Sequence, residues 1–249
     1  MVFLLAILFG LVVGSFLNVF IDRIPRGENV IWKPSHCDFC KKPLRWFELF
    51  PIVSFLAQGG KCRRCKKRLS IQYPLIEFVT ACGFVLLLPS AAVTPIGYVL
   101  ALIIFSVAVV IFVIDLKHQI IPDGALLVLA GALILSAIPL SFMERWNHIL
   151  TACVSGLGFF LLWIITRGRG LGFGDVKLVF LIGLLLGYPL TVVALYIAFL
   201  TGATTGVILI VANRAKMKTR IAFGPFLIAG ALCATVLGER IFVWFYSLI

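Results

Sequence analysis

Long hydrophobic runs without Asp, Glu, Lys or Arg dominate the chain. One membrane crossing takes about 20 residues, so the two longest runs, 78–114 and 178–213, each hold two spans. Their breaks fall at Pro89-Ser90 with Thr94-Pro95 and at Gly187-Tyr188-Pro189. The pattern predicts an all-α polytopic membrane protein with about eight transmembrane helices, over 2–21, 72–88, 95–114, 124–142, 147–166, 176–187, 190–211 and 222–246.

The first run, 1–21, has the length of a secretory signal peptide or of a membrane span. It lacks a basic start, and no small-residue cleavage site precedes the charged segment that follows, so we expect it to stay as the first transmembrane helix. The predicted domains are therefore the first helix, 1–21, a polar loop domain, 22–70, and a transmembrane core of about seven helices, 71–249, which holds the candidate catalytic residues.

Composition excludes the other broad classes. Hydrophobic residues make up 62% of the 249 residues and charged residues 13%, against about 45–50% and about 25% in ordinary soluble domains. The mean hydropathy is +1.13. A soluble globular domain and a disordered chain are both excluded by this balance.

The net charge is +12, and the distribution of the basic residues along the chain agrees with the predicted topology. In a soluble protein this excess would suggest nucleic acid, but here 20 of the 22 Lys and Arg residues fall in the loops on one side of the predicted spans. Basic loops mark the cytoplasmic side and meet anionic lipid. We therefore expect a lipid bilayer and no nucleic acid as partner, with both termini outside.

The loop 22–70 holds two CxxC pairs separated by 21 residues, Cys37 with Cys40 and Cys62 with Cys65. Paired thiolates at this type of spacing build a tetrahedral zinc site, although the gap is slightly longer than the usual range of about 15–20. Redox pairs, disulfides and unliganded thiols are the alternatives, and persistent disulfides are disfavoured in a reducing cytoplasm. Four cysteines leave no open position on the metal, so the predicted zinc is structural.

Carboxylates at the membrane edge are costly and are therefore functional candidates. Asp115 ends the third predicted span and Asp175 opens the sixth, both at the cytoplasmic boundary. Two carboxylates that approach each other can share one proton, so that one activates water while the other polarises a carbonyl, as in aspartic proteases. Helix capping, or ion pairs with Lys117 and Lys177, remains the alternative for both aspartates.

Other residues near these aspartates are weaker candidates. Gly172 and Gly174 permit a tight turn into the helix and the close approach of a substrate strand. Asp123 is either a helix N-cap or part of the site. No HExxH motif is present, so a zinc metalloprotease of the usual form is excluded.

Six motifs in order resemble bacterial type IV prepilin peptidases, also called leader peptidase/N-methyltransferases, over nearly the whole chain. The GxGD motif in Gly172-Phe173-Gly174-Asp175-Val176-Lys177 is the most specific of them. The others are Gly14-Ser15-Phe16-Leu17-Asn18-Val19 with Arg23-Ile24-Pro25, the four-cysteine loop, Ile71-Gln72-Tyr73-Pro74-Leu75-Ile76-Glu77, the segment from Asp115 to Pro122-Asp123, and Phe223-Gly224-Pro225-Phe226-Leu227.

The resemblance implies that Asp115 and Asp175 are the catalytic pair and that Cys37, Cys40, Cys62 and Cys65 bind the metal. It implies cleavage of the short basic leader of a prepilin or pseudopilin at the cytoplasmic face of the inner membrane. It also implies methylation of the new amino terminus from S-adenosylmethionine, because the family members with the cysteine loop are bifunctional. Substrate-positioning candidates are Glu77, Asp123, Gly172, Gly174 and Lys177; for Glu77 a structural ion pair is the alternative.

Two other functions compete with this interpretation. One is a non-enzymatic membrane assembly or transport protein with a zinc-stabilised loop, whose carboxylates carry ions or brace helices. The other is a peptidase that has lost methylation. Replacing Asp175 by Asn separates a scaffold from a protease, and the mass of the mature pilin amino terminus separates a bifunctional enzyme from a peptidase.

Overall fold

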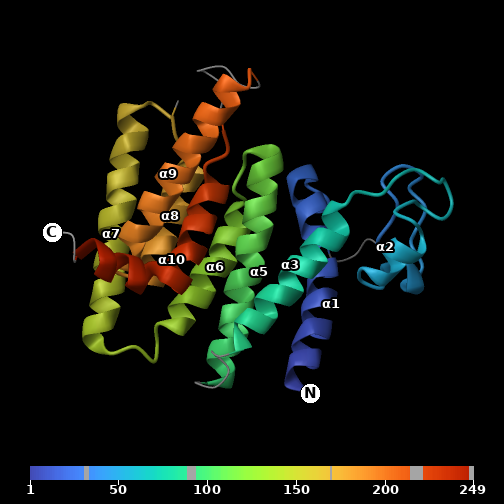
Figure 1. The fold of residues 1–249 in the computed structure, drawn as a ribbon, viewed down its shortest axis with the longest axis horizontal. Helices are drawn as coiled ribbons and strands as arrows, with labels where there is room; N and C mark the ends of the chain where they lie inside the picture. Colours follow the sequence, from blue (N-terminus) through green and yellow to red (C-terminus); the bar gives the residue numbers. More distant parts are fainter. Residues whose placement is uncertain (31–33, 89–93, 169, 214–220, 247–249) are drawn as a thin grey trace. The chain divides into compact units, whose positions relative to one another are not determined.

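A computed structural model describes residues 1–30, 34–88, 94–168, 170–213 and 221–246, the last eight of these by their backbone alone. The expected break at Pro89-Ser90 lies outside the described residues. Within them the regular structure is helical, without strands, which confirms the all-α prediction (Figure 1). The long helices are α1 (Val2–Arg23), α3 (Gln72–Leu86), α5 (Pro95–His118), α6 (Asp123–Ser136), α7 (Phe142–Ile165), α8 (Phe173–Leu186), α9 (Leu190–Val211) and α10 (Gly224–Tyr246).

Each of the eight predicted ranges corresponds to one of these long helices. Four are long and apolar enough to cross a membrane: α1 with the 3-10 turn that follows it (Val2–Arg26), α5, α7 and α9. The helices α3 and α6 and the segment Gly224–Gly238 of α10 are apolar but shorter. The protein therefore has the hydrophobic helices of a membrane protein, and the count of eight crossings stays a prediction.

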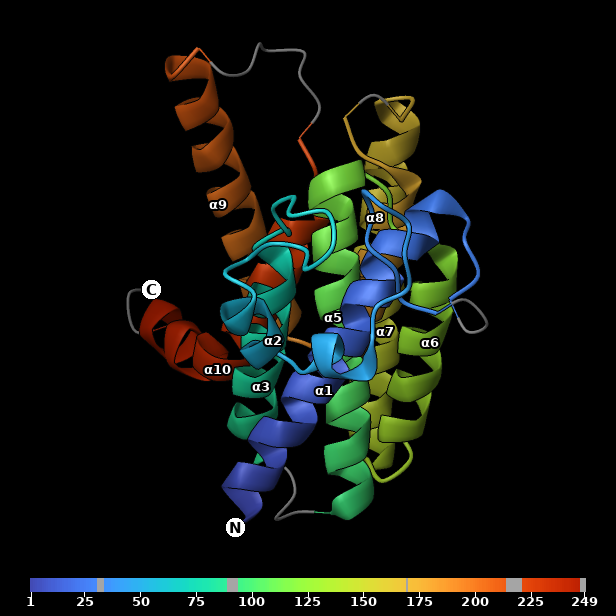
Figure 2. The same ribbon diagram turned by 90° about the vertical axis from the view of Figure 1, so that its right-hand side faces the viewer.

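The chain divides into two compact units, Met1–Val110 and Ile111–Ile249. In the first unit, α1 and α3 cross closely (Figures 1 and 2) because α1 presents glycines at the crossing. A Cβ on Gly10 would lie 2.6 Å from the Cα of Ala81, and one on Gly14 would lie 2.6 Å from the Cα of Glu77. Small residues four positions apart let helix backbones approach in this way inside membranes.

A buried asparagine joins the same two helices. The amide nitrogen of Asn18 donates hydrogen bonds to the carbonyls of Gly14 and Tyr73, and its oxygen accepts one from Gln72, each at 3.2 Å. All its polar atoms are thereby paired, so its burial at this depth carries little cost. The contact fixes how the start of α3 sits against the end of α1.

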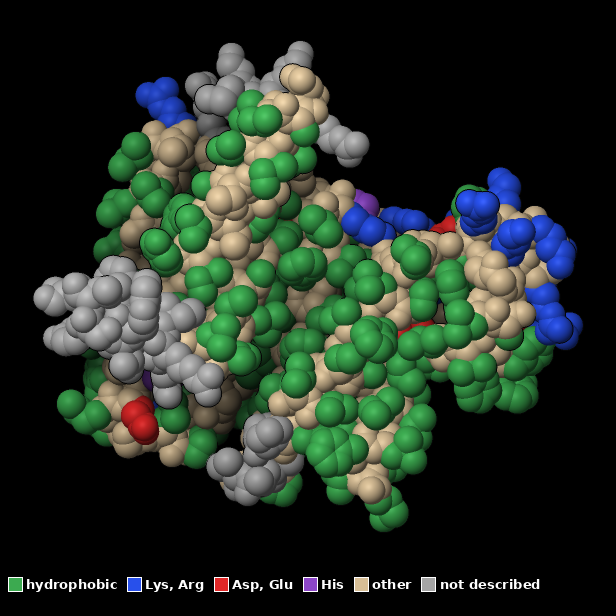
Figure 3. All heavy atoms as spheres, in the orientation of Figure 1, with side chains coloured by type: hydrophobic (Ala, Val, Ile, Leu, Met, Phe, Trp, Pro, Cys, Tyr) green, Lys and Arg blue, Asp and Glu red, His purple; other side chains and the backbone are tan. Residues whose placement is uncertain are grey.

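The polar segment that follows α1 contains the 3-10 turns η1 (Ile24–Arg26) and η2 (Trp46–Leu49) and the short helix α2 (Val53–Ala57). The buried guanidinium of Arg23 holds its beginning by donating to the carbonyls of Asn29, Val30 and Pro34 at 3.0–3.3 Å. Exposed Lys and Arg side chains gather over this segment, whereas hydrophobic side chains cover the long helices (Figure 3). This surface division is the one expected for a cytoplasmic loop beside membrane helices.

In the second unit, α8 packs against α6, α7, α9 and α10. Val179, Leu178 and Ile182 on α8 are almost fully buried. A Cβ on Gly183 would lie 2.7 Å from the Cα of Ala152, so α7 and α8 also meet through a glycine. The surrounded position of α8 matters for function because Asp175 lies in its first turn.

Candidate active site and metal site

Asp115 lies in the last turns of α5 and is 4% exposed. One of its carboxylate oxygens accepts a hydrogen bond at 2.9 Å from the backbone N–H of Gly224, the first residue of α10. That N–H has no partner inside its own helix, because the first N–H groups of any helix lack one. A Cβ at position 224 would lie 2.6 Å from the same oxygen, so glycine is required for this contact.

Asp175 lies in the first turn of α8 and is 8% exposed. Its carboxylate accepts a hydrogen bond at 3.0 Å from the backbone N–H of Gly172, the N-cap residue. The helix-capping alternative is therefore correct for one oxygen of this side chain. The positive end of the helix dipole also favours a carboxylate at this position.

The two aspartates converge within the second unit. Ile121 lies against both glycines beside them: a Cβ on Gly174 would meet Ile121 at 3.0 Å, and one on Gly224 would meet it at 3.4 Å. The carboxyl groups of Asp115 and Asp175 are close enough for their charges to interact. The arrangement places two buried carboxyl groups, each held by a backbone N–H, within range of each other's charge.

Asp123 and Lys177 form an ion pair with each other. The Lys177 ammonium lies 2.7 Å from a carboxylate oxygen of Asp123, and both side chains are exposed. The ammonium also lies 5.1 Å from the centre of the Phe173 ring. Lys177 is thus engaged by Asp123, and the alternative that pairs it with Asp175 is not what the structure contains. The N-cap of α6 is Pro122, so Asp123 is the first helical residue.

Glu77 belongs to the other unit, where it lies on α3 and contacts the polar segment at Ile52. It is 6% exposed, and its carboxylate accepts a hydrogen bond at 2.7 Å from the backbone N–H of Ile52. Among the described residues it makes no ion pair. In the described part of the chain, the group that contacts the Glu77 carboxylate is therefore a neutral N–H and not a positive side chain.

The four cysteines of the loop come together, with all their sulfur atoms within 4.8 Å of one another. The sulfurs of Cys37 and Cys65 are 3.9 Å apart, close to the edge of about 3.8 Å that follows from zinc–sulfur bonds of about 2.3 Å in a tetrahedron. Each CxxC turn is closed by a backbone bond to its first cysteine, from Lys41 at 2.8 Å and from Lys66 at 2.9 Å. The donor set and its spacing fit a tetrahedral thiolate-binding metal.

The local environments of Cys37 and Cys62 shift the pKa values of their thiols in opposite directions. Burial raises the pKa of Cys37 to about 11, whereas backbone N–H groups of Cys65 and Arg64 lower the pKa of Cys62 to about 7.

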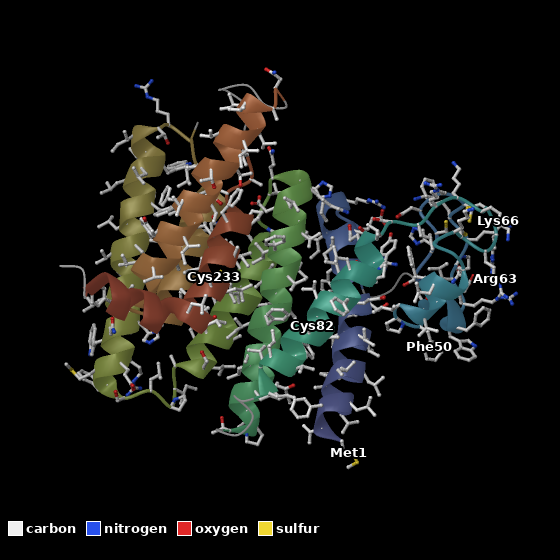
Figure 4. The ribbon with its side chains drawn as sticks, viewed as in Figure 1. Met1, Phe50, Arg63, Lys66, Cys82 and Cys233 are labelled. Atoms are coloured by element: carbon white, nitrogen blue, oxygen red, sulfur yellow. The ribbon has the colours of Figure 1, made fainter. Side chains whose placement is uncertain are left out.

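Lys66 and Arg63 point outward from the second turn, and Cys82 lies on α3 away from the cluster (Figure 4). The turns therefore hold the four sulfurs inward and the basic side chains in solvent.

Two residues of the aspartate site were not among the candidate site residues of the sequence analysis. Gly224 was recognised only as part of the final motif, where its neighbour Pro225 suits the start of a helix. Ile121, between Asp115 and Asp123, offers no such signal, because any large apolar side chain would look alike in the sequence.

The fold and the two sites define a helical membrane protein with a buried aspartate pair and a four-cysteine cluster. Comparison with known families adds two matches: residues 8–90 match the bacterial Peptidase A24 N-terminal domain, and residues 102–207 match the type IV leader peptidase family. No solved structure is significantly similar to the chain.

Among curated proteins, the chain is similar to proteins named prepilin leader peptidase/N-methyltransferase. The one from Bacillus subtilis is 32% identical over 246 residues, covering 97% of this chain and 96% of that protein. The one from Pseudomonas aeruginosa is 31% identical over 270 residues, covering 96% and 91%. The one from Aeromonas salmonicida is 29% identical over 280 residues, covering 99% and 94%. The chain therefore belongs to the type IV leader peptidase family.

Proposed function

We propose that this protein is an aspartic endopeptidase that removes the basic leader of type IV prepilins or pseudopilins and then N-methylates the new amino terminus. The observation that carries the peptidase activity is the convergence of Asp115 and Asp175 in the second unit. The relatives named for both activities along nearly their full length support the pairing of the two reactions.

The two aspartates have different roles in the proposed reaction. The ionised carboxylate takes a proton from a water molecule, whose oxygen attacks the carbonyl carbon of the scissile bond. The protonated carboxyl donates a hydrogen bond to the carbonyl oxygen as negative charge develops there. The proton then passes to the leaving nitrogen as the carbon–nitrogen bond breaks. Gly224 and Gly172 hold the two carboxyl groups through their backbone N–H groups.

The predicted topology supports a site at the cytoplasmic face of the inner membrane. A prepilin has a basic leader before an apolar helix, so its cleavage point lies at a membrane surface. The aspartates occupy the end of α5 and the start of α8, next to the predicted cytoplasmic loops. We place both termini outside and assign positioning of the prepilin to Asp123, Lys177, Gly172 and Gly174.

The loop domain 22–70 holds a structural zinc ion in this proposal, between the first helix, 1–21, and the catalytic core, 71–249. The ligands are Cys37, Cys40, Cys62 and Cys65, whose spacing suits a tetrahedral site. Bound zinc supplies crosslinks that a segment too small for its own core cannot otherwise have. S-adenosylmethionine is the methyl donor for the second reaction.

Mass analysis of a processed prepilin tests the proposed function. The protein and a full-length prepilin are produced together in a bacterial host that lacks its own prepilin peptidase. We expect a product that has lost its leader and gained the mass of one methyl group. A cleaved but unmethylated product would mean that the protein is a peptidase without methyltransferase activity. An uncleaved prepilin beside correctly inserted protein would favour the assembly or transport role, which the names of the relatives do not favour.

A further inference from the structure

An apolar face is exposed on the part of the chain between the two CxxC pairs. The turn η2 and the helix α2 lie in this stretch, and residues 46–60 contain no Lys or Arg. Four of its large apolar side chains are 52–74% exposed, and together they are named here the η2–α2 face: Trp46, Phe50, Val53 and Leu56. A cluster of large apolar side chains that water alone would cover is unfavourable, so this face marks an interaction surface.

The backbone holds these four side chains on one surface. Val53 and Leu56 are three residues apart on α2 and therefore share one side of that helix. The ring centres of Trp46 and Phe50 are 5.9 Å apart. The backbone N–H of Ser54 donates to the carbonyl of Phe50 at 3.0 Å, which links the end of η2 to α2. The face is thus part of an ordered, hydrogen-bonded segment.

The same segment is fixed to α3, a predicted membrane helix. The backbone N–H of Ile52 donates to the Glu77 carboxylate on α3 at 2.7 Å. Phe55 packs inward, because a Cβ on Gly60 would lie 3.2 Å from its ring. Phe78, the residue after Glu77, is exposed on α3. The η2–α2 face therefore starts next to a helix that itself carries exposed apolar side chains.

Positive charge borders the face. Residues 34–70 contain nine Lys and Arg against two acidic residues. The guanidinium groups of Arg45 and Arg63 lie 5.9 Å and 5.5 Å from the centre of the Phe47 ring, and that ring lies 5.8 Å from the ring of Trp46. Neither arginine belongs to an ion pair within the described parts of the chain. This border complements the anionic headgroups of a bilayer.

The apolar and basic sides of the segment point in different directions. Phe50 lies on the side toward the Met1 end of α1, whereas Arg63 and Lys66 lie on the outer side (Figure 4). Hydrophobic side chains cover the lower part of the segment in the view of Figure 3, and Lys and Arg cover its upper and outer parts. Because α1 runs from Met1 toward this segment as a candidate membrane span, the apolar side faces the membrane.

We propose that the η2–α2 face inserts into the bilayer leaflet around the end of α1, the cytoplasmic leaflet in the predicted topology, with Arg45 and Arg63 on anionic headgroups. Tryptophan is enriched at headgroup depth, and the apolar face of an interfacial element enters the boundary of headgroups and acyl chains by about 5–10 Å. This insertion holds the cysteine segment against the membrane surface. It goes beyond the proposed peptidase and methyltransferase activities and depends on neither.

Charge favours lipid over the other possible occupants of the face. A second copy of the chain would bring its own Arg45 and Arg63 toward the same two side chains, and like charges at a contact are unfavourable. A prepilin would bring its basic leader close to the same border. An anionic lipid surface brings charge of the opposite sign and apolar chains together.

Quenching of tryptophan fluorescence in lipid nanodiscs tests the proposal on the full-length protein. Trp46 is kept as the sole tryptophan, and the other four are replaced by phenylalanine. Lipids with brominated acyl chains should quench Trp46 at least about 2-fold, and brominated phosphatidylglycerol should quench more than brominated phosphatidylcholine at equal fraction. Aqueous acrylamide should quench it weakly.

The matched control carries Trp46→Phe and Lys66→Trp in the same background. Its tryptophan reports on the outer side of the segment (Figure 4), so acrylamide should quench it strongly and brominated lipid weakly. Zinc content and helical circular dichroism check the fold of both variants. Cleavage and methylation of a prepilin, measured on the wild type, report on the proposed function separately.

Three results would overturn the insertion. The first is quenching of Trp46 by acrylamide as strong as in the control, without quenching by brominated lipid. The second is protection from acrylamide only when two copies share a nanodisc, which would assign the face to a contact between copies. The third is protection only after full-length prepilin is added, which would assign it to the substrate. Equal quenching by the two brominated lipids would overturn the role of Arg45 and Arg63.

Discussion

The backbone N–H of Gly224 donates a 2.9 Å hydrogen bond to the carboxylate of Asp115, although 109 residues separate them in the chain. The bond ties the start of α10 to the end of α5. It also uses an N–H that the helix leaves free. The position of the carboxylate thus depends on a residue that carries no side chain.

Gly224→Ala should impair cleavage strongly. The added methyl group would lie 2.6 Å from the Asp115 carboxylate oxygen, so the carboxylate must shift. A misplacement of about 1 Å costs on the order of 100-fold in rate. The cleavage rate of a prepilin in liposomes measures this. Gly131→Ala is the matched control, since a Cβ there meets nothing within 4 Å. Equal rates for the two variants would contradict the role of the Gly224 N–H in holding the Asp115 carboxylate.

Gly14→Val should destabilise the first unit. The new side chain would collide with the backbone of α3 at Glu77, and overpacking of this kind costs about 1–3 kcal/mol. Gly158→Val, on α7 with open space around it, introduces the same side chain without a collision. Unfolding in mixed detergent micelles, followed by tryptophan fluorescence, compares the two. A loss of stability no greater for Gly14→Val than for Gly158→Val would refute the close packing of α1 and α3.

Removal of zinc should loosen the loop and leave the long helices intact. We expect about one zinc per chain in the purified protein. A strong chelator should make residues 34–70 sensitive to protease with little change in helical circular dichroism. Zinc displaces the proton of Cys37, whose pKa is about 11 without metal, so the affinity for zinc should fall as the pH is lowered.

Cys62→Ser and Cys82→Ser separate the metal site from the other thiols. The first removes a ligand, so its zinc content should fall well below one per chain. The second changes an exposed cysteine on α3 and should keep the metal. Metal analysis by mass spectrometry decides; full zinc content in Cys62→Ser would count against the four-cysteine site.

Lys177→Met should change substrate affinity more than stability. The exposed ion pair with Asp123 contributes at most about 1 kcal/mol. If Lys177 positions the prepilin, its loss raises KM and leaves kcat nearly unchanged. Steady-state cleavage kinetics and the unfolding midpoint measure the two effects. An unchanged KM would remove Lys177 from the positioning residues.

Much of the fold could be predicted because charge-free runs have the length of membrane helices. The ranges 95–114 and 190–211 correspond closely to α5 and α9, whereas α7 begins at Phe142, five residues before the expected start at 147. Helix ends were less predictable: α6 stops at Ser136, six residues before the expected end at 142, because a hydrophobic run continues after the helix has ended. The cysteine cluster was predictable because each CxxC pair is a local unit.

The contacts made across the fold could not be predicted in the same way. Asp115 and Asp175 were identifiable because acids at membrane edges are rare. Their partner Gly224 and the packing residue Ile121 depend on how helices far apart in sequence meet. Five acids between Asp22 and Glu77 line one cavity of the first unit, and only the folded loop brings them together.

Cleavage of a full-length prepilin by the reconstituted protein tests the central claim most directly, with Asp115→Asn and Asp175→Asn beside the wild type. Each variant keeps the size of the side chain and removes its ability to ionise, and Glu144→Gln controls for the loss of an acid elsewhere. We predict that cleavage by both aspartate variants is slower by about 100- to 10,000-fold and that the rate of the control is unchanged. Cleavage at the wild-type rate by either aspartate variant would contradict the account.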